Sequence, residues 1–247
     1  MNDHPFSLAG QTVLVVGASS GIGAATSALA NRLGARVILS SRSADALAKV
    51  QAELDHPAEA DVVAFDYRDV EAVRLALSPF ERIDHVVIPA VADENKKRGA
   101  FLELDDATMR ASFDKFWGQV NVLRAAVPKM PAGGSATLFA SIAGLKPTGK
   151  DAGLSVMNGV QAAVIQTGRS LAVELAPVRV NVIAPGVVLT NVWNDVERAN
   201  LADWMERTLP ARRAGLPEDL AKAAVSLIAN PYVTGAVLTV DGGLHLV

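Results

Sequence analysis

The sequence predicts one α/β domain over residues 1–247, with a doubly wound parallel sheet of about seven strands and helices on both faces. Short apolar runs alternate along the chain with segments whose apolar residues recur at helical spacing, as strands joined by crossover helices require. Of the 247 residues, 50% are hydrophobic and 20% are charged, so the chain can bury a sizeable core. No linker, repeat or low-complexity tract divides it.

The composition argues against several classes of function. The net charge of −3 offers no basic surface for nucleic acid, and no apolar run reaches the ~18 residues of a membrane helix. The absence of cysteine excludes disulfides, thiolate metal sites and thiol catalysis, and the four histidines lack metal-ligand spacing. Residues 1–10 lack the basic and apolar regions of a secretory signal. We therefore expect a cytoplasmic protein that binds a small molecule and no metal, membrane or nucleic acid.

The first predicted strand is Val13–Val16, whose apolar residues suit a strand buried on both faces. Gly17, Gly21 and Gly23 follow it and lead into a helical pattern that begins near Ile22. A glycine-rich turn between a strand and a helix lets backbone N–H groups converge on an anion such as a phosphate. The spacing Gly-x-x-x-Gly-x-Gly differs from the usual dinucleotide fingerprint, Gly-x-Gly-x-x-Gly, and an ordinary tight turn would use glycines as well.

The second predicted strand, residues 36–40, is followed by Ser41 and Arg42. At this point of a dinucleotide-binding sheet an acid holds the 2′-hydroxyl of NAD, whereas an arginine can neutralise the 2′-phosphate of NADP. No acid occurs here before Asp45. The sequence thus favours NADP(H), with a solvated arginine ahead of a helix as the alternative interpretation.

The same alternation continues to the end of the chain. Further strands are predicted at Val62–Phe65, Asp84–Ile88, Ala136–Ser141, Arg179–Ala184 and Val237–Val240. Helices are predicted at about 106–127 and 155–175, and from Pro217 onward. Trp193, Val196 and Trp204 have roughly helical spacing, and the segment of about 187–210 is either a lid over an apolar site or a plain surface helix. Residues 92–99 are expected to form a solvated loop.

Several motifs occur in a fixed order after the first strand. They are the glycine turn, Ser141-Ile142-Ala143-Gly144, Pro185-Gly186-Val187-Val188-Leu189-Thr190, and a terminal strand followed by Asp241-Gly242-Gly243. Together they resemble the short-chain dehydrogenase/reductase family, over nearly the whole chain from about Leu8. The resemblance implies a Rossmann-like fold, a nicotinamide cofactor and hydride transfer to or from a small molecule. It also implies a homodimer or homotetramer with the two long helices at an interface.

The resemblance also implies which residues bind the cofactor. They are Gly17, Ser19, Ser20, Gly21, Ile22, Gly23, Ser41, Arg42, Asp66, Ala90, Pro185, Gly186, Val188 and Thr190. In this set Asp66 matches the aspartate that contacts adenine, and Thr190 matches the threonine that meets the carboxamide. The chain departs from the family at Ile88-Pro89-Ala90-Val91, where Asn-Asn-Ala-Gly is usual.

The family's catalytic residues are Asn, Ser, Tyr and Lys. Tyr donates the proton, Lys holds the nicotinamide ribose and lowers the pKa of Tyr, and Ser orients the substrate carbonyl. Matching motifs on both sides place Lys115, Ser141, Leu154 and Asn158 at these positions. Lysine and asparagine are exchanged and the tyrosine is missing, so we expect an atypical member with a degenerate tetrad. Leu154 has no ionisable group and cannot transfer a proton.

Two functions are compatible with this site. In the first, Lys115 supplies the missing cation, and an NADPH-dependent oxidoreductase reduces quinone-like or activated carbonyl compounds, whose anions are stable enough to need no tyrosine acid. In the second, the protein is a catalytically inactive NADP(H)-binding sensor or partner subunit. We favour the first, because the cofactor-side residues match the family.

Overall fold

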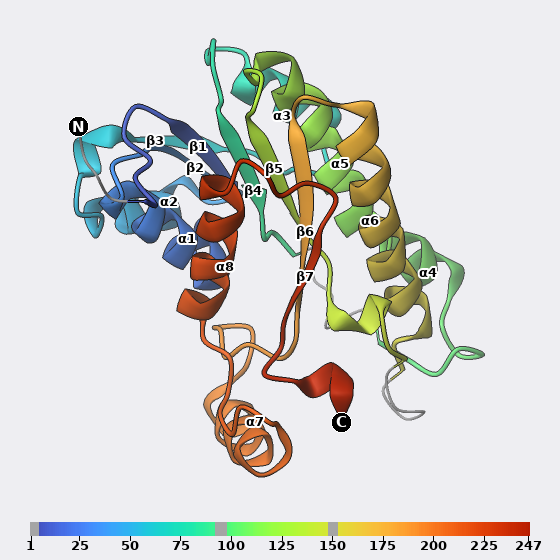
Figure 1. The fold of residues 1–247 in the computed structure, drawn as a ribbon. Helices are drawn as coiled ribbons and strands as arrows, with labels where there is room; N and C mark the ends of the chain where they lie inside the picture. The colour runs from blue at the N-terminus through green and yellow to red at the C-terminus, as the bar shows by residue number, and fades with distance from the viewer. Residues whose placement is uncertain (1–4, 92–97, 148–152) are drawn as a thin grey trace.

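A single seven-stranded sheet forms the centre of the computed structural model, which describes residues 5–91, 98–147 and 153–247 (Figure 1). The strand order is β3-β2-β1-β4-β5-β6-β7, and every neighbouring pair is parallel. The strands are β1 Thr12–Val16, β2 Arg36–Ser41, β3 Ala60–Ala64, β4 His85–Ile88, β5 Ser135–Phe139, β6 Arg179–Pro185 and β7 Val237–Val240. The predicted doubly wound α/β fold is confirmed. Residues 92–97 of the predicted loop lie outside the described residues.

Strand β1 lies between β2 and β4, where the strand order reverses direction. Val13, Leu14 and Val15 are fully buried, because helices cover both faces of the sheet at this strand. In open α/β sheets, ligands bind beyond the carboxyl ends of the strands at such a reversal. The topology therefore places a binding site beyond Val16.

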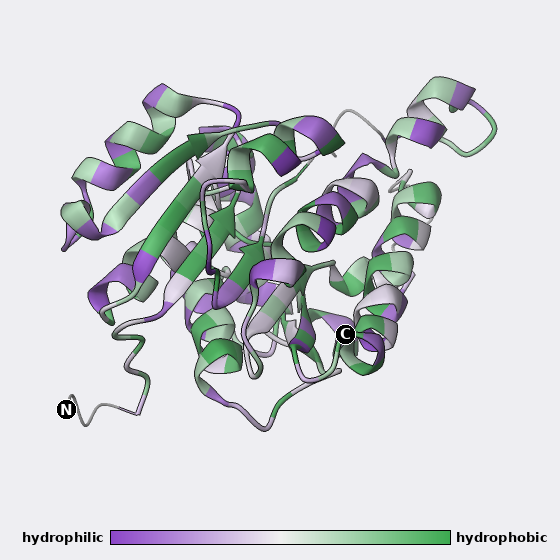
Figure 2. Ribbon diagram, turned by 90° about the horizontal axis from the view of Figure 1, so that it is seen from above, coloured by the Kyte–Doolittle hydropathy of each residue, from purple (hydrophilic) through white to green (hydrophobic). Residues whose placement is uncertain are grey.

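The helices divide between the two faces of the sheet (Figure 1). One face carries α1 (Gly21–Arg32), α2 (Ala44–Ala52) and α8 (Pro217–Ala229), and the other carries α3 (Val70–Leu77), α5 (Asp114–Ala126) and α6 (Ser155–Glu174). Each face has its own cluster of buried apolar side chains, so the sheet separates two cores. Figure 2 shows the hydrophobic residues gathered on the strands and on the helix faces turned toward them.

The prediction of a single helix over about 106–127 is wrong, because the chain forms α4 (Asp106–Ala111) and then α5. Between them the Ser112 hydroxyl donates a hydrogen bond to the carbonyl of Thr108 at 3.0 Å, a contact that often bends helices. Helix α5 starts again at Asp114, which places Lys115 in its first turn.

The predicted fifth strand is also shorter than expected. Strand β5 ends at Phe139, so Ser141 lies in the turn that leads to the short 3₁₀ helix η4 (Ile142–Gly144). Three more 3₁₀ helices, η1 Pro57–Glu59, η3 Val127–Lys129 and η6 Leu244–Leu246, occur in the described chain.

Helix α7 (Asp195–Thr208) lies beyond the carboxyl ends of the strands, near the C-terminus (Figure 1). Asn194 and Glu197 form a capping box at its start, and Met205 is its one buried residue. In the described ranges, no helix combines the length and apolar character that a membrane crossing requires.

Candidate functional site

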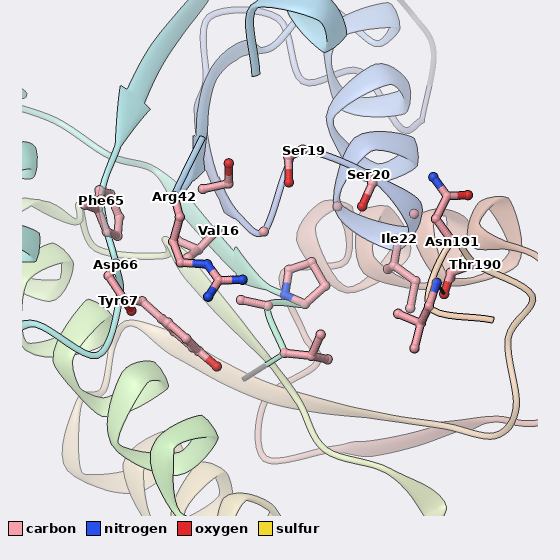
Figure 3. Close-up of a pocket in the computed structure, with 18 of the residues that line it drawn as sticks. Val16, Ser19, Ser20, Ile22, Arg42, Phe65, Asp66, Tyr67, Thr190 and Asn191 are labelled. Carbon is pink, nitrogen blue, oxygen red and sulfur yellow. Dashed lines mark hydrogen bonds between the residues drawn. The ribbon is translucent and has the colours of Figure 1, made fainter. Parts of the chain in front are cut away.

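A groove of about 300 Å³ opens at the carboxyl end of β1, where the topology predicts a ligand. Residues from the ends of β1, β2, β3 and β4 and from the loop after β6 line it (Figure 3). They are Val16, Gly17, Ser19, Ser20, Gly21, Ile22, Gly23, Ser41, Arg42, Phe65, Asp66, Tyr67, Arg68, Pro89, Ala90, Val91, Thr190, Asn191 and Val192. Eleven of the fourteen predicted cofactor-binding residues belong to this lining.

Two glycines of the turn after β1 are packed too closely for a side chain. Gly17 has φ +96°, and a Cβ there would lie 2.8 Å from the Cα of Ala90. A Cβ on Gly23 would lie 2.0 Å from the carbonyl oxygen of Gly17. The side chain of Ser20, the N-cap residue of α1, makes no hydrogen bond to the first turn of that helix. The backbone N–H groups of this first turn are therefore free of a side-chain cap and are suited to donate hydrogen bonds to the phosphates of a dinucleotide.

Arg42 extends from the end of β2 into the groove (Figure 3). Ser41 lies beside it at the groove wall, and its hydroxyl accepts a hydrogen bond from the backbone N–H of Ser43 at 3.2 Å. No carboxylate stands at the end of this strand. This arrangement suits the 2′-phosphate of NADP.

Asp66 and two residues that were not predicted, Tyr67 and Arg68, follow the end of β3 and line the groove. Asp66 accepts hydrogen bonds from Arg68, with Nε–Oδ1 at 2.9 Å and Nη2–Oδ2 at 2.5 Å. The Tyr67 ring packs directly on Gly118 of α5, where a Cβ would lie 2.4 Å from the ring. The only sequence feature that could have pointed to Arg68 is its position two residues after an acid, Asp66, at a strand end.

Lys115 is 3% exposed, so it is not a solvated surface lysine. Its Nζ donates hydrogen bonds to the carbonyl of Ala140 at 3.3 Å and to Gln161 Oε1 at 3.1 Å. One turn later on α5, Gln119 bonds both backbone groups of Phe139, at 3.0 and 3.1 Å. Side chains of α5 thus hydrogen-bond the backbone at the end of β5, directly before Ser141. The role of Gln161 was missed, because it is 46 residues from Lys115.

Ser141 follows the end of β5 and lies beside the last residue of β6, Pro185. Its hydroxyl accepts a hydrogen bond from the N–H of Ala143 at 3.2 Å and donates to the carbonyl of Pro185 at 3.5 Å. Leu154 is half-buried at the start of α6, and its carbonyl accepts a hydrogen bond from the N–H of Asn158 at 2.8 Å. None of the four predicted catalytic positions lines the groove, although the structure places Lys115 against the residue before Ser141.

Comparison with known proteins agrees with this geometry. A family model described as enoyl-(acyl carrier protein) reductase matches residues 17–245. The chain is 36% identical over 249 residues to galactitol 2-dehydrogenase (L-tagatose-forming) from Cereibacter sphaeroides, covering 96% of each. It matches a solved short chain dehydrogenase/reductase family protein at 30% identity and TM-score 0.83, covering 98% of this chain and 100% of that one. The chain belongs to the short-chain dehydrogenase/reductase family.

A second similar structure is a reductase that was crystallised with NADPH. L-sorbose reductase from Gluconobacter frateurii, complexed with NADPH and L-sorbose, matches at 25% identity and TM-score 0.87, covering 99% of this chain and 100% of that one. The comparisons identify this chain as an oxidoreductase of the short-chain type.

The remaining predicted cofactor-binding residues lie at the end of β6 and in the loop that follows it. Thr190 lines the groove, whereas Pro185, Gly186 and Val188 do not. A Cβ on Gly186 would lie 2.7 Å from Asp241 Cβ, so this turn packs against the chain after β7. The carbonyl of Val188 accepts a hydrogen bond from Trp193 Nε1 at 3.0 Å. These contacts hold the loop that carries Thr190. Among the described residues, no cluster of His, Cys, Asp or Glu could hold a metal ion.

Proposed function

We propose that this short-chain dehydrogenase/reductase uses NADP(H). The observation that carries the proposal is Arg42, which lines the groove at the end of β2 where an NAD-type enzyme would hold the ribose with an acid. The glycine turn would hold the pyrophosphate, and Thr190 would hold the nicotinamide end. The NADPH complex of the similar L-sorbose reductase supports this choice. The cofactor supplies a hydride when it is bound.

The proposed substrates are quinone-like or otherwise activated carbonyl compounds. An ordinary ketone becomes a strongly basic alkoxide on reduction, and an oriented proton donor is then worth about 100- to 10,000-fold. Leu154, at the position of the family's tyrosine, cannot supply that proton. A reduced quinone has a phenol-like pKa near 10, so its anion is far better stabilised and water can protonate it.

The chain's own residues would act on the carbonyl oxygen of the substrate. The Ser141 hydroxyl would donate a hydrogen bond to that oxygen. Lys115 holds the Ala140 carbonyl at 3.3 Å and so fixes the backbone on which Ser141 is carried. Its buried positive charge would also stabilise negative charge that develops near Ser141. This proposed role does not require the side chain of Lys115 to reach the substrate.

Calorimetric titration with NADPH and NADH tests the cofactor. We expect the wild-type protein to prefer NADPH, and Arg42→Ala to weaken NADPH binding about 10- to 100-fold, since a charge-assisted contact contributes about 1.5–3 kcal/mol. Arg32→Ala is the matched control, because Arg32 pairs with Asp55 on the surface, away from the groove. Equal affinities for the two cofactors, or full NADPH affinity in Arg42→Ala, would refute the assignment.

Turnover tests the substrate class. NADPH oxidation is followed with quinones, dicarbonyls, simple ketones and simple alcohols as separate panels. We expect slow reduction of the first two and poor activity on the others. Lys115→Ala should lower turnover sharply and Leu154→Ala much less. Lys129→Ala is the control, since Lys129 also donates to a backbone carbonyl, that of Phe80, ahead of the start of β4, whereas Ser141 follows the end of β5. Tight NADPH binding without turnover of any substrate would instead favour the sensor function.

A further inference from the structure

Gln161 is a buried polar residue of α6 that has no role in the reaction proposed above. Its side chain is 3% exposed, and its Oε1 accepts a hydrogen bond from Lys115 Nζ at 3.1 Å. Helices α5 and α6 lie side by side on one face of the sheet, and this bond joins them (Figure 1). Gln161 therefore contacts the ammonium group that holds the backbone next to Ser141.

The backbone of Gln161 also packs against the turn that carries Ser141. Helix η4 begins directly after Ser141 and ends at Gly144, where a Cβ would lie 2.7 Å from the carbonyl carbon of Gln161 and 2.9 Å from its Cβ. The N–H of Gly144 donates a hydrogen bond to the carbonyl of Ser141 at 3.0 Å. One residue of α6 thus contacts both the Ser141 turn and the Lys115 side chain.

A lysine side chain keeps one position only when several contacts hold it. Its four-carbon stem is flexible, and fixing it costs conformational entropy. The Ala140 carbonyl holds Lys115 Nζ from the end of β5 at 3.3 Å, and Gln161 Oε1 holds it from α6. Because these two acceptors belong to different elements, they fix the ammonium group between the sheet and the helix.

The chemistry of the acceptor on Gln161 also matters. An amide oxygen accepts a hydrogen bond from an ammonium group but carries no net charge, whereas a carboxylate in its place would cancel the positive charge. A buried positive charge interacts strongly with negative charge that develops nearby, because the protein interior screens charges less than water does. Gln161 therefore orients Lys115 without cancelling its charge.

We propose that Gln161 is a positioning residue, which holds the Lys115 ammonium group beside the Ser141 turn and so raises the rate of reduction. This inference rests on the proposed function, in which the charge of Lys115 stabilises negative charge near Ser141. It gives a part in the reaction to a residue outside the four predicted catalytic positions, on the helix that packs against α5.

Steady-state oxidation of NADPH with a quinone tests the inference. We expect Gln161→Met to lower kcat about tenfold, the size of one hydrogen bond to a charged group, with little change in KM. Gln161→Glu should lower kcat as well, because its carboxylate accepts the same hydrogen bond but cancels the charge of Lys115. In Lys115→Met, adding Gln161→Met should change kcat less than about twofold. Gln166→Met is the matched control, since Gln166 is exposed on the same helix.

A second measurement needs no cofactor. Urea unfolding of the wild type, of Lys115→Met, of Gln161→Met and of the double variant forms a double-mutant cycle for the two residues. We expect Gln161→Met to lower the unfolding midpoint, because the buried ammonium group loses an acceptor. The same substitution should lower the midpoint much less when Lys115→Met is already present. Full additivity would contradict the contact on which the inference depends.

The outcomes separate this inference from the proposed function. A wild type that turns over no quinone overturns the proposed function itself. If the wild type and Lys115→Ala behave as expected but Gln161→Met or Gln161→Glu keeps full kcat, the inference alone is wrong. It is also wrong if Gln161→Met lowers kcat equally in the wild type and in Lys115→Met, because a purely structural role would do that. Gln161→Glu keeps the hydrogen bond to Lys115 and so gives a second folded variant.

Discussion

Acid should destabilise this protein through one buried histidine. The His85 imidazole is 5% exposed, with Nδ1 2.8 Å from Ser135 Oγ and Nε2 2.8 Å from Gln11 Oε1. Burial lowers the pKa of His85 from 6.5 to about 4, the charge of Arg179 acts in the same direction, and the charge of Asp84 opposes both. The folded protein therefore keeps this ring neutral at a pH at which the unfolded chain is protonated.

The sign and size of the effect follow from linkage. A lowered folded-state pKa gives stability that is fully present above the unfolded value, 6.5, and is lost as the pH falls toward about 4. Between pH 8 and pH 5 the loss should be about 2 kcal/mol. The carboxyl groups of Asp84, Asp219 and Asp241, whose pKa values lie below 3.8, lose their contribution only at lower pH, so they add little to the difference between pH 8 and pH 5.

Urea unfolding at pH 8 and pH 5 measures this loss directly. In His85→Gln, which removes the titrating ring, most of the difference between the two pH values should vanish. His56→Gln is the control, because the side chain of His56 is exposed. A wild-type protein with equal stability at both pH values, or a His85→Gln variant with the full loss, would refute the reasoning.

Two further predictions rest on contacts described above, and a third rests on the family to which the chain belongs. Gly118→Ala places a Cβ 2.4 Å from the Tyr67 ring, so it should cost about 1–3 kcal/mol in urea unfolding and weaken NADPH binding as the groove wall shifts. Asn194→Ala removes the capping box of α7 and should lower stability by about 1 kcal/mol, with faster amide exchange in the first turn of that helix. We also propose a homodimer or homotetramer, so light scattering should give a mass at least twice the 25.8 kDa of one chain, and a monomer mass would contradict this.

Much of the fold could be predicted because the strands are buried on both faces. Strands such as Val13–Val16 are continuous apolar runs, and each is separated from the next by a helical period. The glycine turn and Arg42 could also be placed, because both lie within a few residues of a strand end. Local sequence determines such features almost completely.

The features that could not be predicted depend on contacts between distant residues or on a single side-chain rotamer. The chain breaks between α4 and α5 although the apolar period continues through this segment, and at the break the backbone N–H of Phe113 bonds Arg110 three residues back. The partner of Lys115 on α6, Gln161, is fixed only when the two helices pack. The pairing of Arg68 with Asp66 is local, but nothing in the sequence shows that both line the groove.

The hydrogen bond from Trp193 to Val188 has a consequence for measurement. The chain has three tryptophans, of which Trp193 and Trp204 lie in the segment of about 187–210 and Trp117 lies on α5. Trp193 is three residues from Thr190 at the groove, and reduced nicotinamide absorbs at the wavelengths that tryptophan emits. In Trp117→Phe, resonance energy transfer from the remaining indoles would report the approach of this segment to a bound dihydronicotinamide. The tryptophans of the segment thus serve as intrinsic fluorescence donors, and no attached label is needed.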